Sequence, residues 1–188
     1  MSAAFIPRRR KLSADQFERV GRAGILGEEV RVELIEGDMI EMAPIGSRHA
    51  SAVNTLSMFL ARAVGNAALV STQNPLRLSE DSEPQPDLML LRPSPDRYRS
   101  ALPRPEDVLL LIEVADTTLD YDCGTKLPLY AKHGICEAWI LDLEGMCLVV
   151  YRQPSGSSYG HGLVHGRMDS VAPAPLPTVT LQLRELFA

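Results

Sequence analysis

The stretch "LLLIEVADTTLDYDCGTKLPLY" (residues 109–130) decides the fold. It begins inside an almost wholly apolar run, residues 108–114, which is typical of a central strand buried on both faces. One carboxylate, Glu113, interrupts this run, and after a short loop the apolar residues recur at helical spacing. Pro128 must lie in the first turn of that helix or bend it. The stretch therefore predicts a buried strand that leads into a helix.

Further elements are expected on both sides of this stretch. Ser13 and Gln16 fit a capping box for a first helix, and a second, longer helix is predicted to end at Gly65. The expected elements are helices over 14–22 and within 47–65, a hairpin over 30–35 and 38–43, one broken strand or two short ones over 68–78, and strands over 87–92, 108–114, 136–143 and 146–153. This order predicts an α/β (α+β) fold in which helices flank a mixed central sheet.

The length of 188 residues predicts a single domain. Its expected parts are a core over about 28–152, an N-terminal helix over 13–23 and a Gly- and Pro-rich C-terminal extension over 153–188. No apolar run reaches the roughly 18 residues of a membrane span, and the start of the chain does not fit a secretory signal. We therefore expect a cytoplasmic protein without a membrane partner. The three cysteines form no CxxC pair, which argues against structural zinc, and Cys136 and Cys147 are predicted to be core residues.

The net charge of −5 argues against a protein that coats nucleic acid. It does not exclude an enzyme that meets DNA through one local basic surface. Two clusters could supply such a surface, the run RRRK over 8–11 and the group Arg92, Arg97, Arg99 and Arg104. The alternative for each cluster is solvated charge on a tail or a loop.

Two carboxylates lie at the ends of predicted strands. Asp87 precedes the apolar strand in "EPQPDLMLL" (83–91), and Glu113 lies near the end of the central strand. Each has an ordinary alternative, because aspartate is favoured in turns and a strand-end acid can reach solvent. If the two strands are antiparallel neighbours, however, both acids lie at the same end of the sheet. Converging carboxylates form a hard-oxygen site suited to Mg²⁺ or Mn²⁺.

Asp122, Lys126 and Tyr130 are spaced i, i+4 and i+8, which places them along one face of a helix. In isolation, the first two could be a solvent-facing ion pair. This helix, however, follows the Glu113 strand after a short loop. We therefore predict that the Lys126 amine lies within reach of the Glu113 carboxylate, where it could stabilise developing negative charge or orient a water.

The combined pattern resembles the Uma2 family of bacterial restriction-endonuclease-like proteins (DUF820), part of the PD-(D/E)xK nuclease superfamily. The resemblance runs from about residue 13 to 152. It rests on "VELIEGDMIEMAP…RHASAVNTL", "EPQPDLMLL", "LLLIEVADTTLDYDCGTKLPLYAKHGICEAWILDLE" and "VVYR". Its most distinctive part is the ordered run of Glu-Val, Asp122, Lys126, Tyr130, Gly134, Glu137, Trp139 and Asp142.

The resemblance implies a mixed-sheet core and a divalent-metal phosphodiesterase site. Asp87 and Glu113 match the two catalytic acids that bind the metal, and Lys126 matches a catalytic lysine that has moved from the strand to the next helix. Glu33 in "VELIEG" matches a glutamate that often completes the metal site. Ala115 departs from the superfamily's E-x-K pattern, a departure for which Lys126 could compensate.

Four further residues are possible accessory groups in this site: His49, Gln85, Asp122 and Tyr130. His49 stands where the family shows a histidine near a helix start, and it could contact phosphate or transfer a proton. Its alternative is a helix residue bonded to a neighbouring carbonyl. Gln85 lies two residues before Asp87, and Tyr130 is predicted to pack with a hydrogen-bonding tip. Glu137 and Trp139 are predicted to be structural.

The leading hypothesis is a Mg²⁺-dependent (or Mn²⁺-dependent) endonuclease that hydrolyses DNA phosphodiester bonds. Many such nucleases pair to cut both strands, so analogy suggests a homodimer. The alternative is a catalytically inactive nuclease-fold module that binds nucleic acid or protein. A third hypothesis, a hydrolase of small phosphates, would use the same metal.

Overall fold

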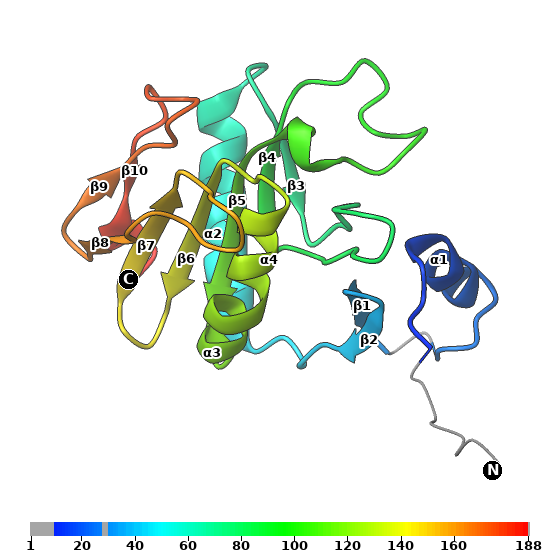
Figure 1. The fold of residues 1–188 in the computed structure, drawn as a ribbon. Coiled ribbons are helices and arrows are strands. Elements are labelled where there is room, and N and C mark those ends of the chain that lie inside the picture. Colours follow the sequence, from blue (N-terminus) through cyan, green and yellow to red (C-terminus); the bar gives the residue numbers. More distant parts are fainter. Residues whose placement is uncertain (1–9, 28–29, 188) are drawn as a thin grey trace, which may run out of the picture.

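A six-stranded mixed sheet organises the chain in a computed structural model that describes residues 10–27 and 30–187 (Figure 1). Its strand order is β3-β4-β5-β6-β7-β8, and only the β5–β6 pair is parallel. The strands are β3 (Leu69–Thr72), β4 (Leu88–Leu91), β5 (Val108–Ala115), β6 (Glu137–Asp142), β7 (Cys147–Arg152) and β8 (Leu163–Gly166). The predicted mixed sheet and its buried central strand are confirmed.

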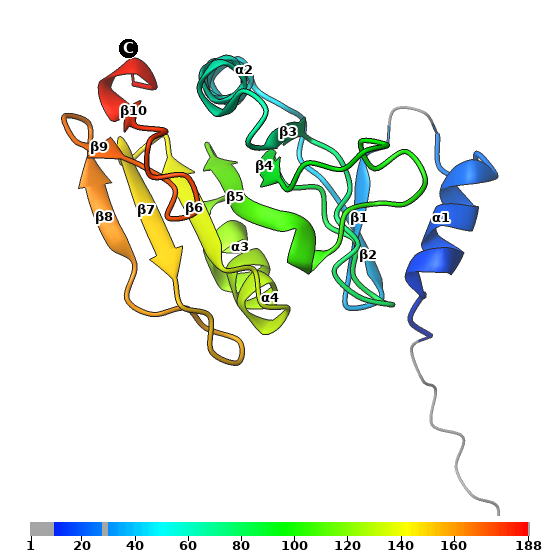
Figure 2. The same cartoon turned by 90° about the horizontal axis from the view of Figure 1, so that it is seen from above.

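Helices cover both faces of this sheet (Figure 2). One face packs against α2 (Ser47–Val64) and the C-terminal segments β9 (Ser170–Val171), β10 (Leu181–Gln182) and η3 (Leu183–Glu185). The other face is covered by α3 (Leu119–Tyr121), the π-helical turn η2 (Asp122–Lys126) and α4 (Leu127–Lys132). Because side chains alternate along β5, Ile112 joins the α2 side of the core, whereas Glu113 points to the side of α4.

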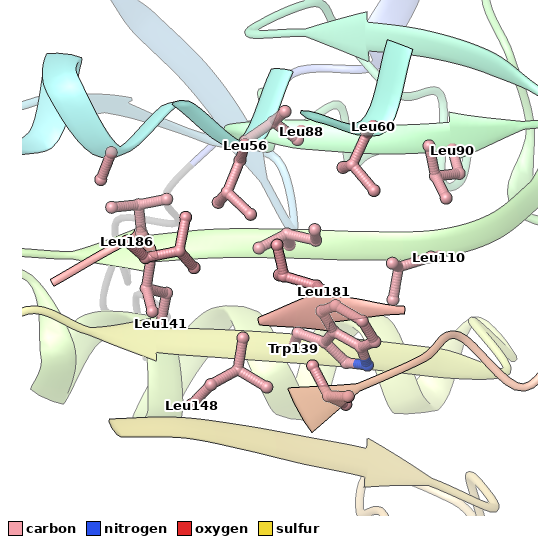
Figure 3. Packing of buried hydrophobic residues seen from close by; sticks show 14 of the residues in the cluster. Leu56, Leu60, Leu88, Leu90, Leu110, Trp139, Leu141, Leu148, Leu181 and Leu186 are labelled. Carbon is pink, nitrogen blue, oxygen red and sulfur yellow. The ribbon is translucent and has the colours of Figure 1, made fainter. Parts of the chain in front are cut away.

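The larger apolar core lies between α2, the sheet and the C-terminal segment (Figure 3). Leu56 and Leu60 of α2 face the fully buried Trp139 and Leu141 of β6 across this core. Leu181 and Leu186, which come from the predicted Gly- and Pro-rich extension, are also buried there. The core therefore extends past the predicted limit at residue 152, because turns and prolines separate short apolar segments that only tertiary contacts bring together.

A separate hairpin carries one of the predicted site residues. It pairs β1 (Val32–Ile35) with β2 (Asp38–Glu41) in antiparallel register, as the sequence predicted. Its turn, Glu36-Gly37, has positive φ at both residues, the geometry that gives a two-residue hairpin turn the twist of its strands. Reciprocal backbone bonds between Leu34 and Glu83 hold the hairpin against the segment that leads into β4.

The N-terminal helix, α1 (Ala14–Arg22), has the predicted capping box between Ser13 and Gln16. Asp15 and Glu18 of this helix form ion pairs with Arg77, which attaches the helix to the body of the molecule. The loop before β5 contains a short 3-10 turn, η1 (Pro105–Asp107).

Two predictions from apolar runs were wrong. Of the broken strand or two short strands expected over 68–78, only the four residues of β3 form, because residues 76–84 turn back on themselves through backbone bonds such as Leu76 to Pro84. Cys136 is exposed and Cys147 is only partly buried, so neither is a core residue. Within residues 10–27 and 30–187, no helix has both the length and the apolar character that crossing a membrane requires.

Candidate active site

The predicted acids meet in a pocket at one end of the sheet. Asp87 directly precedes β4, and because β4 and β5 are antiparallel with Leu88 opposite Ile112, Asp87 lies beside the end of β5 that carries Glu113. The pocket has a volume of about 180 Å³. Its walls come from the hairpin β1–β2, the segment 42–46, the start of α2 and the loop 116–118 that leads into α3. The predicted meeting of the two acids is confirmed.

Asp87 is held by donors from three directions. His49 Nε2 donates to Asp87 Oδ2 across 3.0 Å, the Val114 amide donates to the same oxygen across 2.9 Å, and Gln73 Nε2 lies 3.3 Å from Oδ1. Burial alone would raise the pKa of Asp87, but these hydrogen bonds outweigh burial and lower the pKa below its ordinary value. Asp87 is therefore a fixed, ionised carboxylate.

Glu113 is almost completely buried, with 2% of its surface exposed. Its Oε1 accepts hydrogen bonds from Tyr130 and from Lys126 Nζ, the latter at 3.2 Å. Its Oε2 accepts a longer bond, 3.3 Å, from the Asp87 amide. Burial raises the pKa of Glu113 to about 8, and the neighbouring charge of Asp87 adds to that rise, although Lys126 opposes it.

Lys126 reaches Glu113 from a distorted helix. The segment α3–η2–α4 contains a π turn, in which the Leu127 amide donates to the Asp122 carbonyl five residues back. Pro128 explains the distortion, because it has no amide proton for the Gly124 carbonyl and its ring crowds that carbonyl. The predicted reach of Lys126 to Glu113 is confirmed, but along an irregular helix. Asp122, Lys126 and Tyr130 are all buried, so the solvent-facing alternative is excluded.

Lys126 also contacts the hairpin. Its Nζ lies 3.3 Å from Glu33 Oε2, so a single ammonium group bridges Glu33 and Glu113. Burial alone would lower the pKa of Lys126, but these two carboxylates outweigh burial and raise it above the ordinary value. Glu33 is 1% exposed and also accepts a bond from the Gln85 amide at 3.2 Å. The structure thus brings all four predicted catalytic residues into one pocket.

The predicted accessory residues are placed as follows. Asp122 is buried and accepts a bond from Thr118, and burial raises its pKa. Gln85 lines the pocket and fixes the hairpin through its side-chain bond to the Val32 carbonyl. His49 bonds to Asp87 and not to a neighbouring carbonyl, and its Nδ1 is buried without a hydrogen-bond partner in the described part of the chain.

Sequence reasoning missed Tyr121 and Gln73. Tyr121 donates to Glu33 Oε1 at 3.1 Å, and its ring centroid lies 6.0 Å from Lys126 Nζ. Gln73 has a positive φ of 51°, a rare conformation for this residue type that no sequence pattern reveals. The only available signal for Tyr121 was its position one residue before Asp122.

One of the two predicted basic surfaces, the arginine-rich loop, does not lie at this site. The loop that carries Arg97, Arg99 and Arg104 connects the end of β4 to the start of β5, which is the end of the sheet opposite the acids (Figure 1). Most of the run over 8–11 lies outside the described residues. Arg31, which lines the pocket, and Arg48, which pairs with Asp116 at 3.1 Å, are the nearer cationic groups.

The carboxylate oxygens in this pocket are suitable ligands for a hard divalent cation. Asp87 Oδ1 and Glu113 Oε2 each accept only one bond, of 3.3 Å, so each keeps lone-pair capacity. Burial and the neighbouring charge of Asp87 raise the pKa of Glu113, and a cation would offset both effects. In residues 10–27 and 30–187, no group of three or more His, Cys, Asp and Glu side chains is arranged as a metal site. A cation here would therefore need water, backbone or substrate oxygens as further ligands.

The family comparison matches residues 14–184 to the Uma2 model, described as "Putative restriction endonuclease". Among solved structures, the crystal structure of a putative nuclease belonging to DUF820 from Anabaena variabilis ATCC 29413 has a similar fold, with a TM-score of 0.71. The two chains are 17% identical, and the match covers 94% of this chain and 97% of the other. No match was found among curated proteins. At this identity the structural likeness establishes the fold alone.

Proposed function

Since the chain belongs to the Uma2 family, we propose that it is an endonuclease that uses Mg²⁺ or Mn²⁺ to hydrolyse DNA phosphodiester bonds. The observation that carries this proposal is the convergence of Asp87, Glu113 and Lys126 in one pocket. Two acids and one cation, drawn from two strands and a helix, are the groups that metal-assisted phosphodiester hydrolysis requires. By analogy with nucleases that pair to cut both strands, we also propose that the protein is a homodimer. We further propose that it acts in the cytoplasm.

Asp87 and Glu113 would hold the metal ion. Bound there, a divalent cation polarises a phosphate oxygen and lowers the pKa of a water molecule. The His49 and Val114 donors keep Asp87 ionised and in one orientation. Glu113 must lose its proton to bind a cation, and Lys126 favours that loss because its positive charge lies 3.2 Å away.

Lys126 is suited to act on the substrate directly. An ammonium group has three donors, and the two carboxylates at 3.2 and 3.3 Å use two of them. The third is available for a phosphate oxygen or for the attacking water. During hydrolysis the water oxygen forms a bond to phosphorus and the water gives up one proton to solvent, while the bond from phosphorus to the leaving sugar oxygen breaks and that oxygen takes up one proton. Lys126 would stabilise the negative charge that develops on the phosphate oxygens.

Cleavage of supercoiled plasmid DNA with Mg²⁺ or Mn²⁺ tests the proposal. Asp87→Ala should abolish cleavage, and Lys126→Ala should lower it by roughly 100- to 1000-fold. Lys132→Ala is the matched control, because Lys132 is an exposed lysine of the same helix that pairs with Glu36. Circular dichroism of each variant checks that the fold is retained.

Three outcomes separate the possible functions. If Asp87→Ala and Lys126→Ala both cut as well as the parent, the site assignment is wrong. If the parent binds DNA but cuts it with neither metal, the chain is a nuclease-fold binding module. If it hydrolyses a small phosphate ester in preference to DNA, the substrate class is wrong although the metal site is right.

A further inference from the structure

We infer that Glu33 and Tyr121 form a positioning pair for Lys126, and that Glu33 is not a ligand of the metal. This inference rests on the proposed function, since it concerns how the same site holds its lysine. Tyr121, which lines the pocket, and the hairpin β1–β2, which carries Glu33, would both help to position Lys126.

Both oxygens of Glu33 face protein donors. Oε2 faces Lys126 Nζ at 3.3 Å and the Gln85 amide at 3.2 Å, and Oε1 accepts a bond from the Tyr121 hydroxyl at 3.1 Å. Among the described residues, Glu33 also does not form, with Asp87 and Glu113, a group of three acids arranged as a metal site. A divalent cation bound to Oε2 would also lie close to the positive charge of Lys126, and the two charges would repel each other.

Lys126 is held from two sides by carboxyl groups and from a third side by an aromatic ring. Glu113 and Glu33 fix its ammonium group at 3.2 and 3.3 Å, and the Tyr121 ring centroid lies 6.0 Å away, within reach of a cation–π contact. Glu113 thus contacts Lys126 and also belongs to the proposed metal site, whereas Glu33, on a different element, positions Lys126.

The π turn allows Tyr121 and Lys126 to act together. In a regular α-helix with 3.6 residues per turn, residues five apart point in different directions. The wider turn over Asp122–Lys126, with its bond between residues five apart, brings Lys126 nearly above Tyr121. The distortion that Pro128 imposes therefore places Lys126 and Tyr121 on the same face of the helix, where the Tyr121 hydroxyl bonds to Glu33, the partner of Lys126.

Hydrogen bonds between the hairpin and the segment that leads into β4 fix the position of Glu33. Gln85 donates from its backbone to Glu33 and from its side chain to the Val32 carbonyl, and Leu34 exchanges backbone bonds with Glu83. Three consecutive residues of β1 are thus tied to the segment that leads into Asp87. The position of Lys126 relative to Asp87 is set through this connection as well as through its own helix.

Glu33→Gln and Tyr121→Phe test the positioning pair, with Asp38→Asn as the matched control. Asp38 lies on the other strand of the same hairpin, is exposed and pairs with Lys11. Three quantities are measured for each purified variant: the Mn²⁺ dissociation constant by calorimetry, kcat and KM for DNA cleavage, and the ¹⁵Nζ signal of Lys126, assigned by its absence in Lys126→Ala.

For Glu33→Gln we expect kcat to fall about 100-fold, while KM and the Mn²⁺ dissociation constant stay within about threefold of the parent. For Tyr121→Phe we expect a fall in kcat of about 10-fold, because only the support of Glu33 is removed. The Lys126 signal should shift or broaden in both variants. Asp38→Asn should match the parent in all three measurements.

A tenfold or greater loss of Mn²⁺ affinity in Glu33→Gln would make Glu33 a metal ligand and overturn the inference. An unchanged kcat in Glu33→Gln would overturn it as well. If the parent neither binds Mn²⁺ nor cuts DNA, the proposed function fails, but the Lys126 signal still decides. An unshifted signal in both variants then refutes the positioning pair. If Glu33→Gln does not fold, Tyr121→Phe decides alone by the same criteria.

Discussion

Two buried glutamates in neighbouring parallel strands have opposite surroundings. Glu113 of β5 and Glu137 of β6 are each 2% exposed. Glu137 is surrounded by donors: Trp139 Nε1 and an Arg152 nitrogen bond to its Oε1 at 2.7 and 2.8 Å, and the Ala174 amide bonds to its Oε2 at 2.8 Å. The predicted structural role of Glu137 agrees with these contacts.

Glu113 faces other acids as well as donors. Lys126 and Tyr130 donate to it, but Asp87 and Asp122 raise its pKa by their charge. Burial of a carboxylate does not by itself mark a functional site, since both glutamates are buried. The difference is that every contact of Glu137 stabilises the fold, whereas Glu113 is kept in an environment that a cation would improve.

The largest expected difference between the two residues is in stability at pH 7. Glu137→Gln should lower the free energy of unfolding by about 3 kcal/mol. It leaves Arg152 without its charged partner, and it places the amide NH₂ group, a hydrogen-bond donor, next to groups that are themselves donors. Glu113→Gln should lower it by less, about 1 to 2 kcal/mol, because a pKa of about 8 favours the neutral acid at this pH, although the amide would still face the donors Lys126 and Tyr130. Urea unfolding of both variants and the parent measures this difference.

Activity provides the control for that comparison. Glu113→Gln should abolish metal-dependent cleavage although it remains stable, whereas Glu137→Gln should keep the parent's kcat at a temperature where it is still folded. Equal losses of stability in the two variants would show that the surroundings of the two acids do not differ in the way described.

A second difference should appear as a pH dependence. The pKa of Glu113 is raised to about 8 from an ordinary value near 4.5, so between these values the folded state holds a proton that the unfolded state has lost. Its contribution to stability is fully present below about pH 4.5 and is lost as the pH rises through 8. From pH 6 to pH 8 this should cost about 2 kcal/mol, at about 1.4 kcal/mol per pH unit.

The measurement is urea unfolding of the parent and of Glu113→Gln at pH 6, 7 and 8. Glu83, whose pKa burial raises to about 7, contributes a slope of the same sign in both proteins, so only the difference between them reports on Glu113. Identical slopes would mean that Glu113 is ionised in the folded protein at pH 6.

Sequence patterns predicted those features that depend on local order. The apolar runs predicted the strands, and the caps predicted α1 and α2. Asp87 and Glu113 were predicted to meet if their strands were antiparallel neighbours, which β4 and β5 are. The contact between Tyr121 and Glu33 could not be predicted in this way, because 88 residues separate them and no periodicity links a hairpin to a helix.

The C-terminal part of the core was missed for a related reason. Leu181 and Leu186 lie in short apolar segments between prolines and turns, too short for a recurrent pattern, and they become core residues only through contact with α2 and the sheet. The π turn was missed because Pro128 predicted a bend without defining its form.

The smallest expected difference concerns one hydroxyl group. Tyr130→Phe removes the donor to Glu113 without a change of shape, and its cost should depend on the charge of that acid. A bond to a neutral acid contributes about 1 kcal/mol and a bond to an ionised one about 2 kcal/mol. The cost in unfolding free energy should therefore rise by about 1 kcal/mol between pH 6 and pH 9.

Tyr159→Phe is the control, because the Tyr159 hydroxyl donates at 2.7 Å to the Ile135 carbonyl, which does not titrate. A cost for Tyr130→Phe that is as independent of pH as that of Tyr159→Phe would show that Glu113 does not change its charge in this range, and that its surroundings resemble those of Glu137 more closely than the geometry indicates.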